Sequence, residues 1–177
     1  MSYVVAPYEA DAQMAYLERI GLVSAILTED SDLLVFGCRH VLFKLDTEAN
    51  TVKSISRDRF GSVNDPRGIS LQGWSDSQFR AMAILSGCDY LPNIQGIGLK
   101  TAWTLLKKHR NAENVIRTLK MEGKKDVPPG YLQAFYLAEK VFLHQRVYDP
   151  IWGMIVNLTP IPEDEEWDVE NEAHVGE

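Results

Sequence analysis

Residues 21–32 read GLVSAILTEDSD, a short apolar run that ends in a cluster of acidic and hydroxyl side chains. The apolar part, Leu22–Leu27, has the length of a strand and little polar alternation, which is typical of a strand buried on both faces of a parallel sheet. Helices cover such sheets, so this stretch predicts an α/β fold. Asp30 and Asp32 follow the carboxyl end of the strand, where open α/β sheets place their ligand sites.

The segments on either side of this strand favour the same fold class. Tyr8–Ile20 is predicted to be a helix that stops at Gly21. Val41–Leu45 and Val52–Ile55 flank a polar turn and predict a hairpin-like strand pair. Arg57–Gly73 is rich in Gly, Asp, Asn and Pro without periodicity, which predicts a surface loop. The apolar residues near helical period in the first helix are Ala10, Met14, Leu17 and Ile20.

The second half of the chain is predicted to be helical. Ser75–Gln78 has the S-x-x-Q form of a capping box and predicts a helix that runs to Gly87. With the helices that follow, Ser86–Asp149 is expected to be an all-helical module. Those helices are predicted at Leu99–His109, Ala112–Lys120 and Pro129–Gln145.

Charge is distributed unevenly around the net value of −7. Eight of the 25 Asp and Glu residues lie in a tail without Lys or Arg, which leaves 17 against 18 Lys and Arg elsewhere. Residues 95–125 carry a basic surplus of six, which alone fits a solvated helix face better than a nucleic-acid surface. The acids of the tail are Glu163, Asp164, Glu165, Glu166, Asp168, Glu170, Glu172 and Glu177. The charged residues of the basic stretch are Lys100, Lys107, Lys108, Arg110, Arg117, Lys120, Lys124 and Lys125, with Glu113 and Glu122.

Several classes of site and location are disfavoured. Cys38 and Cys88 lack C-x-x-C spacing and lie beside apolar residues, so we expect buried thiols rather than a disulfide or metal site. The four His residues are scattered, which argues against zinc. Neither a membrane-spanning run nor a signal-peptide pattern is present, so a soluble intracellular protein is expected.

Three acidic clusters are candidates for catalysis: Glu9 with Asp11, Asp30 with Asp32, and Asp89. Each has a structural alternative, because carboxylates also stabilise the first turn of a helix and form caps or turns. Two divalent ions held by such carboxylates can neutralise a phosphodiester, activate water and stabilise the leaving oxygen. Mg²⁺ prefers hard oxygen ligands, so this inventory suits it.

A second motif follows the last acidic cluster. Gly96-Ile97-Gly98 is a tight turn that leads directly into a predicted helix, with Lys100 and Thr101 at its start. Glycines let a backbone approach a phosphate, and the helix start supplies unpaired N–H donors and a favourable dipole. Together with the basic surplus, this motif favours non-specific contact with a DNA backbone over a simple turn.

At this point the residues resemble a known family, the XPG-type 5′ nucleases, and within it the exonuclease 1 branch more than the flap endonucleases. The resemblance covers about residues 4–160. The motifs that carry it are Pro7–Gln13, Thr28–Asp32, Phe36–Cys38, Leu85–Leu91, Gly96–Gly98 and Tyr148–Pro150.

The resemblance implies a PIN-like (5′–3′ exonuclease) parallel-sheet half-domain at 1–85, a helix–hairpin–helix-like (helix–two/three-turn–helix) DNA-binding module at 86–150, and a return segment with the acidic tail at 151–177. It implies a monovalent cation, such as K⁺, near Ser86 and the Ile97 carbonyl, although Asn93 stands where a serine is expected. It also implies that two Mg²⁺ or Mn²⁺ ions are bound by Glu9, Asp11, Asp30, Asp32 and Asp89.

The implied activity is hydrolysis of double-stranded DNA at 5′ ends, nicks and flaps in nuclear repair and recombination. Family members also carry an N-terminal half with two further metal-binding aspartates, whereas Met1 stands eight residues before Glu9 here. We therefore expect either a fragment of a larger enzyme or a non-catalytic DNA-binding or scaffold remnant. A PIN-like ribonuclease is a third alternative, which the motif at Gly96–Ala102 and the helical module disfavour.

Overall fold

The computed structural model describes residues 3–63, 65–66, 68–165 and 167–176, without the side chain of Glu170. The chain divides into two compact units. Residues 1–59 with 140–177 form one, here called the α/β unit, and residues 60–139 form the other, here called the helical unit. The division falls within α6 (Tyr131–His144). The mixed α/β class predicted from the sequence is confirmed.

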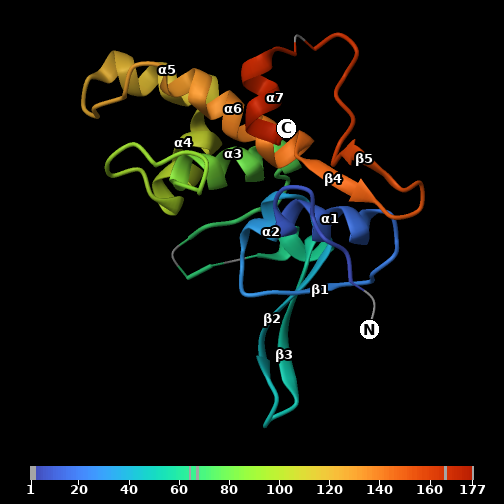
Figure 1. Ribbon diagram of the computed structural model, residues 1–177. Coiled ribbons are helices and arrows are strands. Elements are labelled where there is room, and N and C mark those ends of the chain that lie inside the picture. Colours follow the sequence, from blue (N-terminus) through green and yellow to red (C-terminus); the bar gives the residue numbers. More distant parts are fainter. Residues whose placement is uncertain (1–2, 64, 67, 166, 177) are drawn as a thin grey trace. The chain divides into compact units, whose positions relative to one another are not determined.

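The α/β unit contains a three-stranded sheet in the order β1-β2-β3. β2 (His40–Asp46) and β3 (Thr51–Ser56) pair antiparallel and form the long ribbon seen in Figure 1. β1 (Ile26–Leu27) runs parallel to β2, with Ile26 opposite Val41. The predicted hairpin and the predicted parallel strand are therefore both present in one sheet.

The prediction that Leu22–Leu27 is a strand buried on both faces is wrong. Only its last two residues pair, and Ile26 is buried while Leu27 and Leu22 are each 52% exposed. β1 has a single paired neighbour among the described strands, so it lies at the sheet edge. An edge strand lacks the cover that makes a central parallel strand apolar throughout.

The first helix, α1 (Ala10–Arg19), was predicted correctly, but its buried face was not. The side chains that pack inward are Ala12, Gln13 and Ala15 rather than the apolar set that includes Met14 and Leu17. Gln13 is 3% exposed because its amide bonds both backbone groups of Tyr148, at 2.8 and 2.7 Å. A buried amide with both ends satisfied costs little, so it replaces an apolar residue here.

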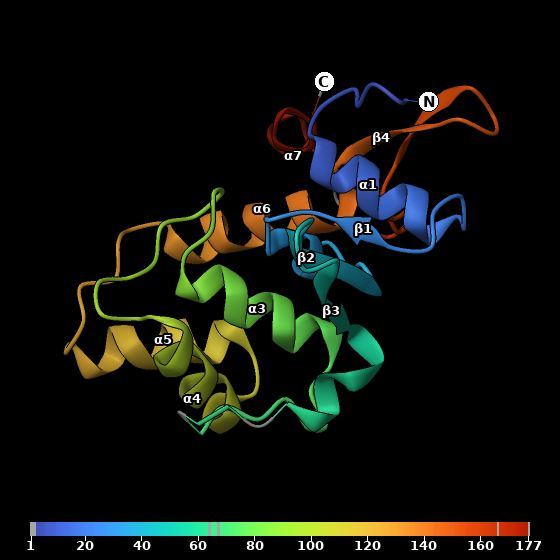
Figure 2. The ribbon, with the colours of Figure 1, turned by 90° about the horizontal axis from the view of Figure 1, so that it is seen from below.

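After α6 the chain forms a second, two-stranded sheet of β4 (Arg146–Asp149) and β5 (Met154–Asn157). The expectation of helix as far as Asp149 is therefore wrong. Residues 146–149 alternate in burial, which suits a strand packed on one side. Figure 2 shows β4 beside α1, and the two elements are in contact.

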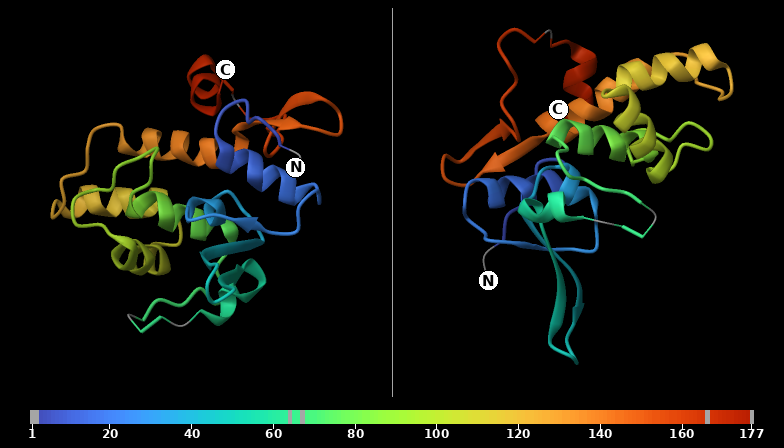
Figure 3. Two further views of the ribbon diagram at one scale, coloured as in Figure 1. Left: turned by 60° about the horizontal axis from the view of Figure 1, so that its bottom comes forward. Right: turned by 180° about the vertical axis from the view of Figure 1, so that it is seen from behind.

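The chain ends in α7 (Val169–Val175), within the segment described from the sequence as an acidic tail. The Asp168 side chain caps this helix by accepting from the Asn171 N–H at 2.8 Å. Figure 3 shows α7 beside the segment that precedes α1, and a Cβ at Gly176 would touch the ring of Tyr8. Glu166 and Glu177 of the tail, and Met1, lie outside the described residues.

The helical unit is built from α3 (Asp76–Ser86), α4 (Leu99–His109), α5 (Ala112–Glu122) and the first part of α6, close to the predicted ranges. Both hydrogen bonds of the predicted capping box are present at Ser75 and Gln78. Figure 2 shows α3, α4 and α5 packed together. The side chains of Leu85, Leu106 and Ile116 fill the core between them.

The predicted loop from Arg57 to Gly73 is more ordered than expected. It begins with a 3-10 helix, η1 (Arg57–Ser62), and Ile69 and Leu71 are buried in the helical unit. The Trp103 indole N–H bonds the Ser70 carbonyl at 2.8 Å, which ties the loop to α4. Asn64 and Arg67, which the loop prediction included, lie outside the described residues.

Neither cysteine forms a disulfide; Cys38 is buried and Cys88 is half-buried. Burial raises the pKa of the Cys38 thiol to about 12, so this group is protonated and inert at neutral pH. Buried thiols were expected at both positions, and the structure bears this out for Cys38 but only in part for Cys88. Among the described residues, every helix is too short or too polar to span a bilayer.

Candidate metal-binding and nucleic-acid-binding sites

Glu9 and Asp11 occupy the start of α1. Glu9 is the N-cap residue in extended conformation, but its carboxylate forms no capping bond to the helix. Instead, its Oε2 accepts from the Gln145 side-chain amide at 3.0 Å. Asp11 lies in the first turn. The helix start explains the position of Asp11, but it does not explain where the Glu9 carboxylate points.

Asp30 and Asp32 follow β1 on a tight turn. Asp30 Oδ1 accepts from the Asp32 N–H at 2.8 Å, and the Asp30 N–H donates to the Thr28 hydroxyl at 3.0 Å. Asp32 is the first residue of α2 (Asp32–Val35), which packs against α1. The turn role that the sequence allowed for Asp30 is therefore real, and it uses one of two carboxylate oxygens while the side chain stays exposed.

These four carboxylates supply the hard oxygen donors that Mg²⁺ or Mn²⁺ requires, so the donor chemistry fits a divalent ion. Within the part of the chain that the structure describes, however, no three His, Cys, Asp or Glu side chains lie close enough together to hold a metal. Asp89 belongs to the helical unit, so its approach to the other four stays a prediction.

Asp89 lies on a tight turn directly after α3. Gly87 ends that helix at φ +100°, and Cys88 and Leu91 then exchange two backbone hydrogen bonds of 3.1 and 3.2 Å. Asp89 and Tyr90 are the two residues between them, and Asp89 is exposed. A carboxylate at the tip of a short bridge is held by its backbone and remains accessible.

The predicted turn at Gly96-Ile97-Gly98, here called the glycine hairpin, is present. Its two glycines differ in backbone conformation and in the space around them. Gly96 has φ +78°, and a Cβ there would collide with the ammonium of Lys125. Gly98 is the extended N-cap of α4, and nothing lies within 4 Å of a Cβ built on it. The surface over Gly98 is open at a helix start, an arrangement that accommodates an anion.

The basic stretch keeps most of its charge unpaired. Glu113 pairs with Arg117 at 2.7 Å and Glu122 pairs with Lys124 at 3.4 Å. The remaining six basic side chains have no carboxylate partner among the described residues, and all but Lys125 are exposed. These six are Lys100, Lys107, Lys108, Arg110, Lys120 and Lys125.

Lys125 lies beside the glycine hairpin, a position that the sequence did not predict. It was counted as one of eight bases, yet its ammonium lies against Gly96, across two helices of sequence. Its position depends on the loop after α5, which periodicity does not predict. A lysine beside the hairpin adds positive charge where the backbone of a nucleic acid is expected to pass.

The groups proposed for a monovalent cation are already engaged within the helical unit. The Ile97 carbonyl accepts from the Asn93 amide at 2.8 Å, and the Ser86 hydroxyl donates to the Ala83 carbonyl at 2.8 Å. Asn93 thus places an N–H donor on an oxygen that would coordinate the ion. A cation at Ile97 has to share that carbonyl with Asn93 or displace its amide.

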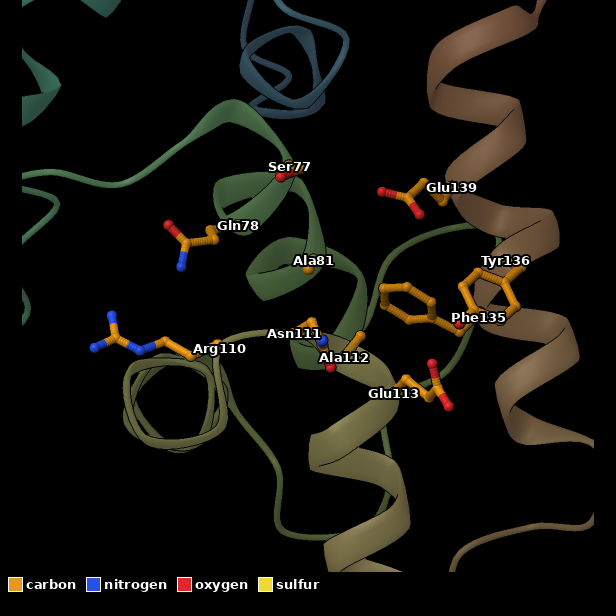
Figure 4. Close-up of a pocket in the computed structure, with 10 residues that line it drawn as sticks. All are labelled: Ser77, Gln78, Ala81, Arg110, Asn111, Ala112, Glu113, Phe135, Tyr136 and Glu139. Carbon is orange, nitrogen blue, oxygen red and sulfur yellow. The ribbon is translucent and has the colours of Figure 1, made fainter. Parts of the chain in front are cut away.

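The helical unit also contains a pocket of about 230 Å³ away from the predicted residues. Figure 4 shows Phe135 and Tyr136 on one side of it and Arg110 on the other. Burial, followed by the nearby Glu113, raises the pKa of Tyr136, so its hydroxyl stays protonated. The lining carries Glu113 and Glu139 as well as Arg110, so it has no single charge preference.

The chain is similar to known proteins over most of its length. The family model of the XPG I-region matches residues 1–89. Exonuclease 1 of Xenopus laevis is 44% identical over 168 residues, which cover 93% of this chain and 22% of the relative. Exodeoxyribonuclease 1 of Schizosaccharomyces pombe is 42% identical over 98% of this chain and 29% of its own length. The chain therefore spans less than a third of these two relatives.

The fold is also similar to that of several solved structures. Flap endonuclease-1 from Methanococcus jannaschii has a TM-score of 0.55 at 27% identity, over 77% of this chain and 38% of that one. The catalytic core of Rad2 in complex with DNA substrate has a TM-score of 0.68 at 21% identity, over 91% and 56%. The junction-resolving enzyme GEN-1 binding potassium has a TM-score of 0.59 at 23% identity, over 83% and 41%.

Proposed function

Because this chain belongs to the XPG family of nucleases, we propose that it is part of a metal-dependent, structure-specific 5′ nuclease that acts on DNA. The proposal is carried by one observation: carboxylates at the starts of α1 and α2 precede, in the same chain, an open glycine hairpin that begins a basic helix. The substrate is double-stranded DNA with 5′ ends, nicks or flaps, and the setting is nuclear repair and recombination.

The proposed division of labour assigns the metal ligands to Glu9, Asp11, Asp30, Asp32 and Asp89. When bound, two Mg²⁺ or Mn²⁺ ions supply phosphate neutralisation and an activated water. The chain's own contribution is to hold each carboxylate: Gln145 fixes Glu9, and the Asp30 turn fixes the N–H of Asp32.

The hairpin is proposed as the DNA clamp. The turn Gly96-Ile97-Gly98 is proposed to bring the open start of α4 to the phosphates, with Lys100 and Thr101 at that start and Lys125 beside Gly96. The Ile97 N–H donates to the Ile94 carbonyl at 2.8 Å, so the free donors are those of the first turn of α4. These contacts neutralise phosphate charge without reading bases, so affinity depends on salt rather than on sequence. A K⁺ ion at the Ser86 hydroxyl and the Ile97 carbonyl is the proposed bridge to a phosphate.

We also propose that the ligand set is completed by the N-terminal half that relatives carry. Two observations support this: no three potential ligands gather within the described residues, and β1 is an edge strand with exposed Leu22, Val23 and Leu27 nearby. An unpaired edge beside apolar side chains is suited to receiving further strands. By itself the 177-residue chain should then be nearly inactive.

A second candidate function is a DNA-binding or scaffold protein that retains the clamp without catalysis. The open start of α4 and the basic side chains without carboxylate partners near it favour this function, because they can bind a phosphate backbone without a metal ion. One experiment separates the two: cleavage of a 5′-flapped duplex in Mg²⁺ by the chain alone and by the chain joined to the N-terminal half of an exonuclease 1 relative. Cleavage only by the joined protein, abolished by Asp30→Ala without loss of solubility, supports the nuclease. Duplex binding with no cleavage in either form supports the scaffold.

A further inference from the structure

One face of α1 is hydrogen-bonded to residues 145–149, which directly follow α6. Three side chains at helical spacing each bond to it: Glu9 to Gln145 at 3.0 Å, Gln13 to Tyr148, and Tyr16 to Asp149 at 2.7 Å. All of these residues belong to the α/β unit. Because Glu9 is at one end of this series, residues 145–149 control where its carboxylate points.

Gln145 differs from the other residues that fasten the helix because it bonds a carboxylate proposed to bind metal. Its side chain is fully buried at 0% exposure. Its backbone is fixed on both sides, since its N–H donates to Val141 at 3.2 Å and its carbonyl accepts from Leu158 at 2.9 Å. The backbone that carries the amide is therefore held in place, and burial restricts the rotamers open to the side chain.

The orientation of the amide follows from chemistry. The Gln145 Nε2 donates to Glu9, whereas its Oε1 is buried with no hydrogen-bond partner among the described residues. Turning the amide over would place that oxygen against the Glu9 carboxylate, so repulsion fixes the donor toward Glu9. If this position only had to fill space, an apolar side chain would avoid burying an unpaired carbonyl.

We propose that Gln145 is a positioning residue that orients the Glu9 carboxylate for metal binding. The inference rests on the proposed function and deepens it, by assigning part of the metal affinity to a residue 136 positions away in the sequence. Residues that orient metal ligands through hydrogen bonds typically change metal affinity by about 10- to 100-fold when they are lost. Gln145 acts through Glu9 and is not itself a ligand.

The test compares Gln145→Met with Tyr16→Phe in the chain joined to the N-terminal half of an exonuclease 1 relative. Methionine has similar volume but no donor, and Tyr16→Phe removes a hydrogen bond from the same helix face without touching Glu9. Mn²⁺ affinity is measured by electron paramagnetic resonance, and thermal unfolding is followed without metal. We expect Gln145→Met to weaken Mn²⁺ binding about 10-fold or more, and Tyr16→Phe to leave it within about twofold of wild type, because Tyr16 does not act through Glu9.

Gln145→Asn, which withdraws the amide by one methylene, gives the same comparison should the methionine variant not fold. In a Glu9→Gln background, the Gln145 substitution should have no further effect on Mn²⁺ affinity, because the two act through one carboxylate. Wild-type affinity in the Gln145 variants, or an equal loss in Tyr16→Phe, would overturn the inference alone. A joined wild-type protein that binds no Mn²⁺ would overturn the proposed metal site together with it.

Discussion

Gly96 and Gly98 are two residues apart but are glycines for different reasons. Gly96 adopts φ +78°, a conformation that costs other residues about 1–2 kcal/mol, and it lies under the Lys125 ammonium. Gly98 has ordinary extended geometry with open space around its Cα. The fold therefore requires a glycine at position 96, whereas Gly98 leaves room for a ligand to approach the backbone.

This difference predicts different effects on stability for the same substitution at the two positions. Gly98→Val should weaken duplex binding about tenfold, which corresponds to roughly 1.4 kcal/mol, while costing about 1 kcal/mol of stability or less. Gly96→Val should also lower the unfolding temperature, because a valine at φ +78° strains the backbone. Fluorescence anisotropy with a short duplex and thermal unfolding measure the two effects. Normal DNA binding by folded Gly98→Val would exclude close backbone approach at this glycine.

Lys125 and Lys124 form a natural pair for testing the clamp. They are adjacent, but Lys124 pairs with Glu122 whereas Lys125 lies against Gly96. Lys125→Ala and Lys100→Ala should each reduce the slope of log affinity against log salt by about one unit. Lys124→Ala should leave the slope unchanged. Equal slopes for Lys124→Ala and Lys125→Ala would show that Lys125 has no special contact with phosphate.

Asn93 is expected to limit cation binding at the proposed monovalent-cation site. Its amide already donates to the Ile97 carbonyl, so an ion at that oxygen competes with a 2.8 Å hydrogen bond. Asn93→Ser should remove this competitor and make duplex binding in K⁺ exceed binding in a bulky organic cation by a wider margin than in wild type. Titrations at constant ionic strength measure this margin. An unchanged margin in Asn93→Ser would mean that Asn93 does not govern the site.

At the scale of elements, the stability of the α/β unit depends on the hydrogen bonds between α1 and residues 145–149. Asp149 is central to this contact, since it accepts from the Tyr16 hydroxyl and from the N–H groups of Ile151 and Trp152. Burial alone would raise the pKa of Asp149, but these hydrogen bonds outweigh it and lower the pKa below its usual value. Burial, followed by the hydrogen bond to Asp149, raises the pKa of Tyr16 to about 12.

A lowered carboxyl pKa gives a pH dependence of known sign. Asp149 stabilises the fold above the pKa of an unfolded aspartate, about 3.9, and that contribution is lost as the pH falls through the lower folded pKa. Asp149→Asn should therefore unfold at lower temperature than wild type at pH 7, and the gap should narrow below about pH 4. Thermal unfolding across pH checks this. A gap that stays constant down to pH 2 would mean that the carboxylate charge is not responsible.

Local signals predicted much of the fold. The capping box at Ser75, the range Leu99–His109 and the β2–β3 hairpin depend on residues close in sequence, and each was found. The buried face of α1 and the strand β4 were missed because both depend on distant partners. Gln13 is buried only because Tyr148 returns to it.

The residues of the candidate site also differ in whether local sequence or distant contacts determine their roles. Asp30 and Gly98 stand out in the sequence because a strand end or a helix start marks them. Gln145 and Lys125 do not, because their roles come from contacts across 136 residues and across two helices respectively. The single available signal for Gln145 was its place just before the Tyr148–Pro150 motif of the family resemblance.

At the scale of the whole molecule, the central proposal is that Asp89 binds the same metal ions as Asp30 and Asp32. Asp30 and Asp32 belong to the α/β unit, whereas Asp89 belongs to the helical unit. The most direct test is a crystal structure of the chain joined to the N-terminal half of an exonuclease 1 relative, soaked with Mn²⁺ and measured at the manganese absorption edge. The account predicts manganese peaks within bonding distance of oxygens from Asp30 or Asp32 and from Asp89. Peaks that exclude Asp89, or an Asp89 on the opposite face of the protein from Asp30, would contradict it.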